Sequence, residues 1–263
     1  ISLGEASHYN LFINQHVQLN VSDTQGAVAA RDITLNRYDV GINNDNSLGL
    51  TYSDQLTLQN SNTIVGAVSQ VNASYFDDAF AQLTALSDSL AQLTATHTLY
   101  EQWSNLNATN LGAESDVALG YISGADFVTA SQFSWDIDSA FSEQTSLIIN
   151  VSGATLDLDT FSTWALGIDA NRIIYNFYEA TSLSLTQDMR GNILAPNADF
   201  THTSGLLTGR LIANSYTSNE NGGTQNNYLG AFNPIASPWQ LEQETVSDVP
   251  QPATGILLTL ALL

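Results

Sequence analysis

The feature that most constrains the fold of this chain is a long series of short apolar runs separated by turn residues. Residues 1–70 and 117–232 both show it, with β-branched residues alternating in the runs and Asn or Gly between them. Such runs, at steps of roughly 5 to 10 residues, are typical of a sandwich, a barrel or a β-helix. No strict sequence repeat is visible, so this periodicity leaves the three architectures open.

One segment has a different period. Within residues 72–103, apolar side chains recur every three or four positions, which is the pattern of an amphipathic helix. The stripe consists of Phe76, Ala79, Phe80, Leu83, Leu86, Leu90 and Leu93. We expect a helix over about residues 74–98, with Ser74 and Asp77 as its N-terminal capping pair.

The charged residues exclude several classes of function. Only 5 residues are Lys or Arg, against 26 Asp and Glu, which leaves a net charge of −21. Such a chain lacks the basic patch needed to bind nucleic acid or an anionic membrane surface. It has no cysteine, and therefore no disulfide, thiolate nucleophile or Cys-ligated zinc. The acidic, amide-rich and hydroxyl-rich composition favours a secreted protein, and we expect a signal peptide to have been removed before Ile1.

Residues 237–263 differ from the rest in composition. Pro238, Pro250 and Pro252 mark an extended linker, which ends in the apolar run 256–263. This run is too short to cross a bilayer as a helix, which needs about 20 residues. We therefore divide the chain into one domain at 1–236 and a tail at 237–263 with an apolar strand or anchor segment.

Several segments resemble the choice-of-anchor A surface domain over roughly residues 3–234. The segments that carry the resemblance are 3–12, 26–30, 173–177, 180–183, 191–198, 209–214 and Phe232. This family occurs in exported bacterial proteins, is classed as adhesive, and is similar to ice-binding β-helix domains. The resemblance thus implies a mainly β, right-handed β-helix-like domain with one long flanking α-helix and an extended C-terminal tail.

Two parts of the resemblance have local physical consequences. In the most specific block, we expect Gly191 to allow a tight turn before a buried strand and Pro196 to end hydrogen bonding at a strand edge. Residues 249–254 resemble the Pro-Glu-Pro C-terminal sorting signal, with Gln251 in place of Glu and no Arg cluster after the apolar run. We expect contact with a membrane only through a C-terminal anchor, if the chain continues.

The ionisable residues point to no catalytic centre. The four histidines lack metal-binding spacing, and no nucleophile elbow or phosphate loop is present. Residues 201–203, which include His202, are expected to form a surface ridge. The carboxylate pairs Asp136/Asp138 and Asp157/Asp159 would each lie on one side of a strand, and they are weak candidates for calcium. A solvated acidic face is the preferred interpretation, and a glycosidase acid–base pair the least favoured. We expect no catalytic residue, no cofactor and no other metal site.

Aromatic and basic side chains are interpreted structurally. We expect Trp103, Trp135, Trp164 and Trp239 to pack in the interior rather than form a sugar platform. Arg172, Arg190 and Arg210 flank apolar strands and are expected to pair with carboxylates.

The first functional hypothesis is a non-enzymatic extracellular structural or adhesive protein. Its apolar tail would dock on a second copy and generate a head-to-tail filament. The contact residues would be Ile256, Leu257, Leu258, Leu260, Leu262 and Leu263. The alternative is a module that binds ice or polysaccharide. Ice binding favours Thr-x-Thr rows, which appear only at 94–98 and 201–203. A carbohydrate-active enzyme is the third and least favoured class.

Overall fold

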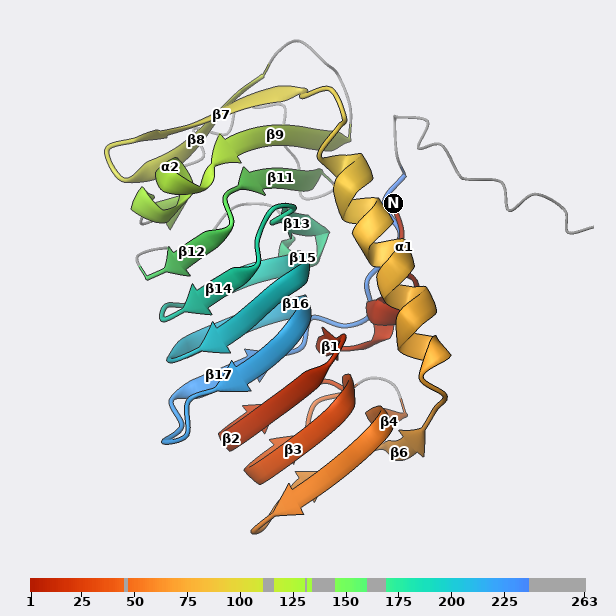
Figure 1. Ribbon diagram of the computed structural model, residues 1–263. Coiled ribbons are helices and arrows are strands. Elements are labelled where there is room, and N and C mark those ends of the chain that lie inside the picture. The colour runs from red at the N-terminus through yellow and green to blue at the C-terminus, as the bar shows by residue number, and fades with distance from the viewer. Residues whose placement is uncertain (45–46, 111–115, 131, 134–144, 160–168, 237–263) are drawn as a thin grey trace, which may run out of the picture.

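The computed structural model describes residues 1–44, 47–110, 116–130, 132–133, 145–159 and 169–236. In these residues the chain forms a stack of mainly parallel strands wound into a β-helix, with one long helix along its side (Figure 1). The helices are α1 (Ser74–Leu90), α2 (Gly124–Thr129), and the 3-10 helices η1 (Gly4–His8) and η2 (Ala170–Arg172). The strands are β1 (Leu11–Ile13), β2 (His16–Thr24), β3 (Val28–Val40), β4 (Leu48–Gln59), β5 (Thr63–Ile64), β6 (Ala67–Gln70), β7 (His97–Gln102), β8 (Asn105–Asn110), β9 (Val117–Ser123), β10 (Gln132–Phe133), β11 (Ser146–Ser152), β12 (Thr155–Leu158), β13 (Ile173–Asn176), β14 (Ser182–Leu185), β15 (Met189–His202), β16 (Gly205–Ser218) and β17 (Thr224–Asn227).

The two halves of the chain meet in the middle of the stack. β1 and β2 pair with β16 on one side and with β3 on the other. From β3 the chain continues outward to β4 and β6, and α1 then runs back along the stack to the distant coil that begins with β9 (Figure 1). The 17 residues of α1 span about 25 Å, roughly the height of five strands spaced about 4.8 Å apart.

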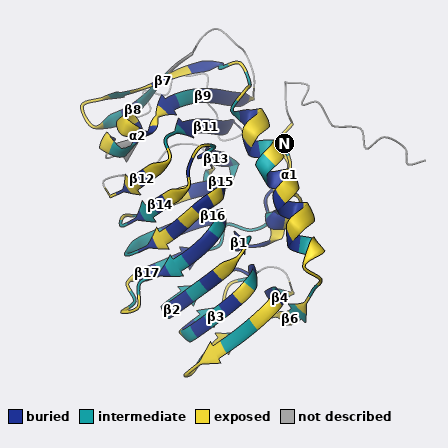
Figure 2. Ribbon diagram, viewed as in Figure 1, coloured by how far each residue is buried: buried dark blue, intermediate teal, exposed yellow. Residues whose placement is uncertain are grey.

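The interior of the β-helix is filled by stacked apolar side chains. In β3 and the C-terminal half of β15, buried residues alternate with exposed or half-buried ones, as the banded colouring in Figure 2 shows, because successive side chains of a strand point to opposite faces. Because the strands are in register, side chains of one position lie over one another; Phe200 and Tyr216, for example, stack with ring centroids 5.9 Å apart. One inward row contains Leu156, Leu183, Phe200, Tyr216, Val17, Ile33 and Leu56.

A second apolar cluster lies between α1 and the outer side of the coils. Phe76, Phe80 and Leu83 of α1 pack against outward apolar residues such as Phe12 and Ile212. The rings of Phe12 and Phe80 stack with their centroids 5.5 Å apart. The apolar stripe seen in the sequence is therefore the face by which α1 attaches to the β-helix.

The start of α1 at Ser74 is as predicted, but its C-terminal end and its N-terminal capping differ from the prediction. The helix ends at Leu90 rather than near residue 98, and His97 begins β7, which pairs antiparallel with β8. The β-branched residues at 94, 96 and 98 favour an extended chain there. The predicted capping pair is also wrong: Ala73 is the N-cap and makes no side-chain hydrogen bond, and Asp77 pairs with Arg31 instead.

The strands near Pro196 are longer than the sequence indicated. Pro196 lies within β15 rather than at its end, but the pairing with β16 is interrupted between Ala195 and Asp199, as predicted for a residue that ends hydrogen bonding. Gly191 also lies within β15 rather than at a turn before it, opposite Gly209 of β16. Both glycines have positive φ, and a Cβ on Gly209 would lie 1.9 Å from the Gly191 oxygen. This close approach of two coils requires glycine.

Arg210 is a buried cross-link, with 1% of its surface exposed. Its guanidinium donates hydrogen bonds to the backbone oxygens of Tyr9, Ser7 and Gly230 and to Oδ1 of Asn192, at 2.7 to 2.9 Å. We predicted carboxylate partners, and these four acceptors are amide oxygens. They come from segments that are distant in sequence, so the position of this side chain could not be predicted from neighbouring residues.

Candidate functional site

One outer face of the β-helix carries a regular array of polar side chains, which we call the ladder face. It is formed by the outward residues of β12, β14 and β2 and of the C-terminal parts of β15, β16, β3 and β4. Its central row, one residue on each successive strand, is Asp157, Ser184, Thr201, Thr217, Gln18, Thr34 and Thr57.

The array is regular in two directions. Neighbouring members of a row are about 4.8 Å apart across the strands, and alternate residues along one strand are about 6.7 Å apart. A second row flanks the first, two residues earlier on the strands. It includes Thr155, Ser182, Asp199 and Ser215, followed by His16, Asp32 and Gln55 on β2, β3 and β4.

Hydrogen bonds between strands hold several of these side chains in place. The Ser184 hydroxyl donates to Asp157 Oδ1 at 2.7 Å, and the Ser215 hydroxyl donates to Asp199 Oδ1 at 2.6 Å. The Asn214 amide donates to the same Asp199 oxygen at 2.9 Å. The hydrogen bonds from Ser215 and Asn214, with a smaller contribution from the charge of His16, lower the pKa of Asp199 below its ordinary value. This carboxylate is therefore ionised at neutral pH, and its orientation is restricted.

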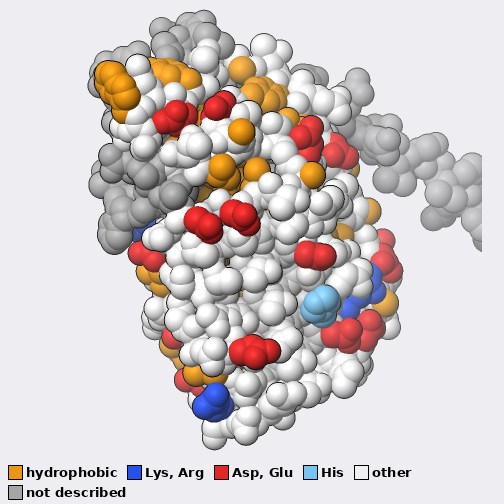
Figure 3. All heavy atoms as spheres, turned by 60° about the vertical axis from the view of Figure 1, so that its left-hand side comes forward, with side chains coloured by type: hydrophobic (Ala, Val, Ile, Leu, Met, Phe, Trp, Pro, Cys, Tyr) orange, Lys and Arg blue, Asp and Glu red, His pale blue; other side chains and the backbone are white. Residues whose placement is uncertain are grey.

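Uncharged polar groups dominate the broad surface over these strands, with scattered carboxylates (Figure 3). Hydroxyl and amide groups can both donate and accept hydrogen bonds, whereas the carboxylates only accept. None of the ladder-face residues named above is aromatic. Such a surface can bind a partner by many weak, repeated polar contacts.

Of the two carboxylate pairs predicted as calcium candidates, the structure describes only Asp157 and Asp159. Asp157 and Asp159 are both exposed, and each accepts a hydrogen bond from β14 or the residue that follows it: Asp157 from Ser184, and Asp159 from Thr186 at 3.0 Å. Asp136 and Asp138 lie outside the described residues. Within the described part of the chain, no group of three or more His, Asp or Glu side chains is arranged to hold a metal ion.

Two further predictions are wrong. His202 is not on a surface ridge but is fully buried in the β-helix, where its Nδ1 lies 2.8 Å from the Tyr216 hydroxyl. Burial lowers the pKa of His202 to about 4. Trp103 is not packed in the interior; it is 85% exposed, between β7 and β8. The other three tryptophans lie outside the described residues, as do the tail residues 256–263.

The ladder face itself was missed by the sequence analysis. The Thr-x-Thr pattern occurs at 94–98 and at 201–203. Thr201 belongs to the central row, whereas the segment 94–98 does not. Thr201 and Thr217 are neighbours in this row, and Gln18 is next to Thr217 although about 200 residues separate them in sequence. Alternating polar residues within a strand indicate an exposed face. Which residues line up in one row depends on which strands become neighbours, and this cannot be seen within a single strand.

One protein family and several solved structures are similar to this chain. Residues 46–227 match a family model described as "Putative Ice-binding-like adhesive domain". No curated protein matches the chain in sequence. Among solved structures, the chain is similar to an ice-binding protein from the Antarctic ascomycete Antarctomyces psychrotrophicus, with 15% identity, a TM-score of 0.49, and coverage of 89% of this chain and 99% of that one.

Two other similar structures have comparable scores. An ice binding protein from an Antarctic biological consortium has 15% identity and a TM-score of 0.49, over 88% of this chain and 90% of the other. One from an Antarctic bacterium of the Flavobacteriaceae has 16% identity and a TM-score of 0.48, over 90% of this chain and 48% of the other.

Proposed function

The chain belongs to the family of ice-binding-like adhesive domains, and from this premise we propose that it is a non-catalytic adhesive module of an extracellular or cell-surface protein. The ladder face is its contact surface. The observation that carries this proposal is the central row, in which seven strands each present one polar residue at the same position.

The ladder face suits a partner that is itself extended and repetitive. A single exposed hydroxyl or amide contact contributes little net free energy, because it replaces a hydrogen bond to water. Many such contacts at a fixed spacing act together once the first has formed, since the remaining contacts become intramolecular. We therefore propose a polysaccharide surface as the target, whose repeated hydroxyl groups can donate to Asp157 and Asp199 and accept from the Thr and Ser residues.

Ice is the second candidate, because four of the seven central positions are threonine: Thr201, Thr217, Thr34 and Thr57. Threonine offers a methyl and a hydroxyl group in one stiff side chain. The ionised carboxylate of Asp199 on the same face favours the polysaccharide, because a charged group is strongly hydrated and costly to transfer from liquid water.

The test uses Thr34→Tyr and Thr217→Tyr, which place a bulky ring in the central row at positions where a strand tolerates tyrosine. Thr63→Tyr is the matched control, because Thr63 is exposed on β5 opposite Asp39, and neither residue belongs to the two ladder-face rows. We expect the unmodified chain to be depleted from solution by insoluble cellulose or chitin. Both ladder variants should bind about tenfold more weakly, and the control should bind normally.

Thermal hysteresis measured on the same four proteins separates the two targets. Hysteresis that is lost in both ladder variants would identify ice as the partner. If the unmodified chain shows neither binding nor hysteresis, or if the control is affected as much as the ladder variants, the ladder face is not the contact surface.

We also propose that the domain assembles head-to-tail through its tail. At the coil farthest from β9, β4 pairs with β3 along most of its length, but β6 covers only residues 48–52 on the other side. Large apolar side chains are exposed nearby, including Leu58 at 52% and Val68 at 48%. The apolar run 256–263 of a second copy would add to this open coil as a further strand.

Deleting residues 250–263 tests this assembly. The full chain should form filaments that electron microscopy can detect, and the shortened chain should stay folded and monomeric in light scattering. A shortened chain that still assembles would contradict the proposal, and so would a full chain that remains monomeric.

None of the helices in the described part of the chain is long and apolar enough to cross a membrane.

A further inference from the structure

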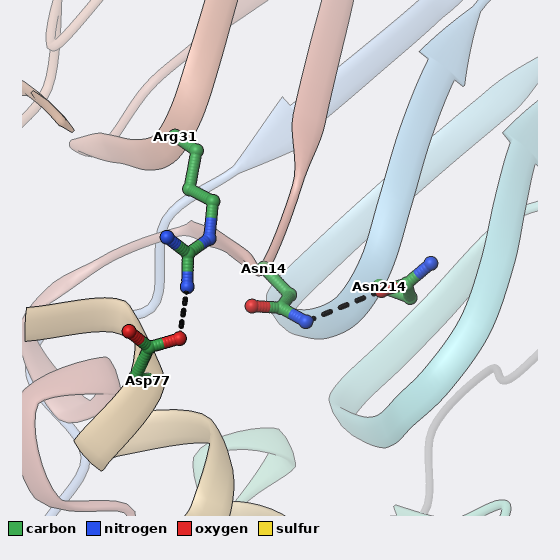
Figure 4. Close-up of polar contacts among 4 residues, drawn as sticks. All are labelled: Asn14, Arg31, Asp77 and Asn214. Atoms are coloured by element: carbon green, nitrogen blue, oxygen red, sulfur yellow. Dashed lines mark hydrogen bonds and ion pairs between the residues drawn. The ribbon is translucent and has the colours of Figure 1, made fainter. Parts of the chain in front are cut away.

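A groove of about 480 Å³ lies between α1 and the corner of the coils at which the ladder face begins. Part of its lining is shown in Figure 4, where Asp77 of α1 faces Arg31 and Asn14 lies beside Asn214. The polar lining includes Asn14, Arg31, Asp77, Thr84, Asp88 and Asn197. These residues belong to neither row of the ladder face, so the groove lies beside that face rather than on it.

Irregular backbone on consecutive coils builds the groove. Arg31 occupies the register shift between Ala30 and Asp32 in β3, and Asn197 lies within the shift between Ala195 and Asp199 in β15. Asn14 lies in the break between β1 and β2, which are between β3 and β16 in the stack. A bulge re-aims the side chain that would otherwise continue the regular pattern. Here the shifted residues line the groove beneath α1.

Arg31 is an unusual residue for such a place. Its side chain is only 13% exposed, although it is one of five cations in a chain with net charge −21. Nη2 contacts Asp77 Oδ1 at 2.5 Å, and the guanidinium carbon lies 5.9 Å from the centre of the Phe76 ring. Its Nε is buried and has no hydrogen-bond partner among the described residues. A buried donor without an acceptor is costly, so the side chain of Arg31 has an unmet hydrogen-bonding demand at the wall of the groove.

The charge and shape of the groove select the ligand class. Arg31 contributes one positive charge and the carboxylates of Asp77 and Asp88 two negative ones, so an anionic ligand is disfavoured. Adjacent hydroxyl groups of a pyranose ring can donate to a carboxylate and accept from a guanidinium or an amide. Phe80 and Pro196 provide apolar surface for the carbon skeleton.

We propose that this groove binds a neutral hexose unit of a polysaccharide, an inference that rests on the proposed adhesive function and specifies part of its target. The volume is within the range of small-molecule sites, about 300 to 1,000 Å³. The groove is continuous with the ladder face through Asn214, which accepts a hydrogen bond from Asn14 at 3.3 Å and donates one to Asp199. A chain lying on the ladder face can thus place one sugar unit under α1.

The experiment is calorimetric titration of the full chain with soluble neutral hexaoses of glucose, mannose and N-acetylglucosamine, and with an oligogalacturonate as the anionic comparison. We expect at least one neutral hexaose to bind and the oligogalacturonate not to bind. Ala81→Trp, at an exposed helix position that lines the groove, should abolish binding. Gln82→Trp is the matched control, because Gln82 is the next exposed residue and lines a different hollow, beside Glu5.

A second pair of variants tests the role of the cation. Arg31→Gln should weaken binding by about tenfold or more. Arg37→Gln, which removes an exposed arginine of the same strand, should leave it unchanged. The proposal is overturned if no neutral hexaose binds, if the anionic sugar binds more tightly, or if Ala81→Trp binds as well as Gln82→Trp.

Failure of the groove proposal can be distinguished from failure of the ladder-face proposal. Thr34→Tyr should retain hexaose binding in solution while losing depletion by insoluble polysaccharide. If hexaoses fail to bind but the insoluble polymer still depletes the chain through the ladder face, only the groove proposal is wrong.

Discussion

The burial of His202 predicts a specific dependence of stability on pH. The imidazole lies inside the β-helix, between the ring of Phe200 and the hydroxyl of Tyr216. Burial lowers its pKa from 6.5 to about 4. In the unfolded chain the ring is solvated and takes up a proton near pH 6.5. Protonation therefore stabilises the unfolded state first, and the folded state loses stability as the pH falls from 6.5 towards 4.

The size of the effect follows from the shift in pKa. Each pKa unit corresponds to about 1.4 kcal/mol, so the full shift of roughly 2.5 units is worth about 3.4 kcal/mol below pH 4. At pH 5 the loss is about 2 kcal/mol relative to pH 7.5, because 1.5 units lie between 6.5 and 5. Titration of the carboxylates is common to the wild type and to a variant without His202, so it cancels when the two are compared.

The assay is urea unfolding of the wild type and of His202→Gln at pH 7.5 and pH 5.0. His202→Gln keeps a polar group near Tyr216 and removes the titration, so its stability should fall by about 2 kcal/mol less than that of the wild type. If wild type and His202→Gln lose the same free energy between the two pH values, the histidine is not held neutral inside the fold.

Three further predictions concern the packing of the coils. Arg210→Met should lower the free energy of unfolding by about 3 to 5 kcal/mol, because two buried and two partly buried oxygens lose their donor; urea unfolding measures this, and a loss below 1 kcal/mol would contradict the cross-link. Gly209→Ala should destabilise at least as strongly, because its Cβ would meet the Gly191 oxygen at 1.9 Å; thermal unfolding should show a lower midpoint, and an unchanged midpoint would refute the close approach. Asp77→Asn should cost at most about 1 kcal/mol, since the carboxylate paired with Arg31 is 66% exposed; the difference from wild type should shrink in 1 M salt, and one that persists would indicate a role other than ion pairing.

Local patterns were sufficient to predict many elements of this fold, although not the end of α1 or the start of β7. The apolar spacing at Phe76, Phe80 and Leu83 predicted a helix that packs by one face, and the structure confirms it. Alternating runs predicted strands such as 155–158 and 182–185, which are β12 and β14. The resemblance, rather than the periodicity, selected the β-helix. These features depend on residues within a few positions of one another, and local sequence records them directly.

The tertiary structure decided which strands became neighbours, and this determined the candidate sites. Gln18 and Thr217 meet only because the two halves of the chain join in mid-stack. The same joining places the Tyr9 oxygen against Arg210. His202 is buried because it faces inward on β15, where it contacts Tyr216 of the neighbouring strand. Arg31 reaches the groove because a register shift turns it towards α1. Contacts between residues about 200 positions apart depend on the register of a whole stack, because an offset of one residue would exchange its inward and outward sides.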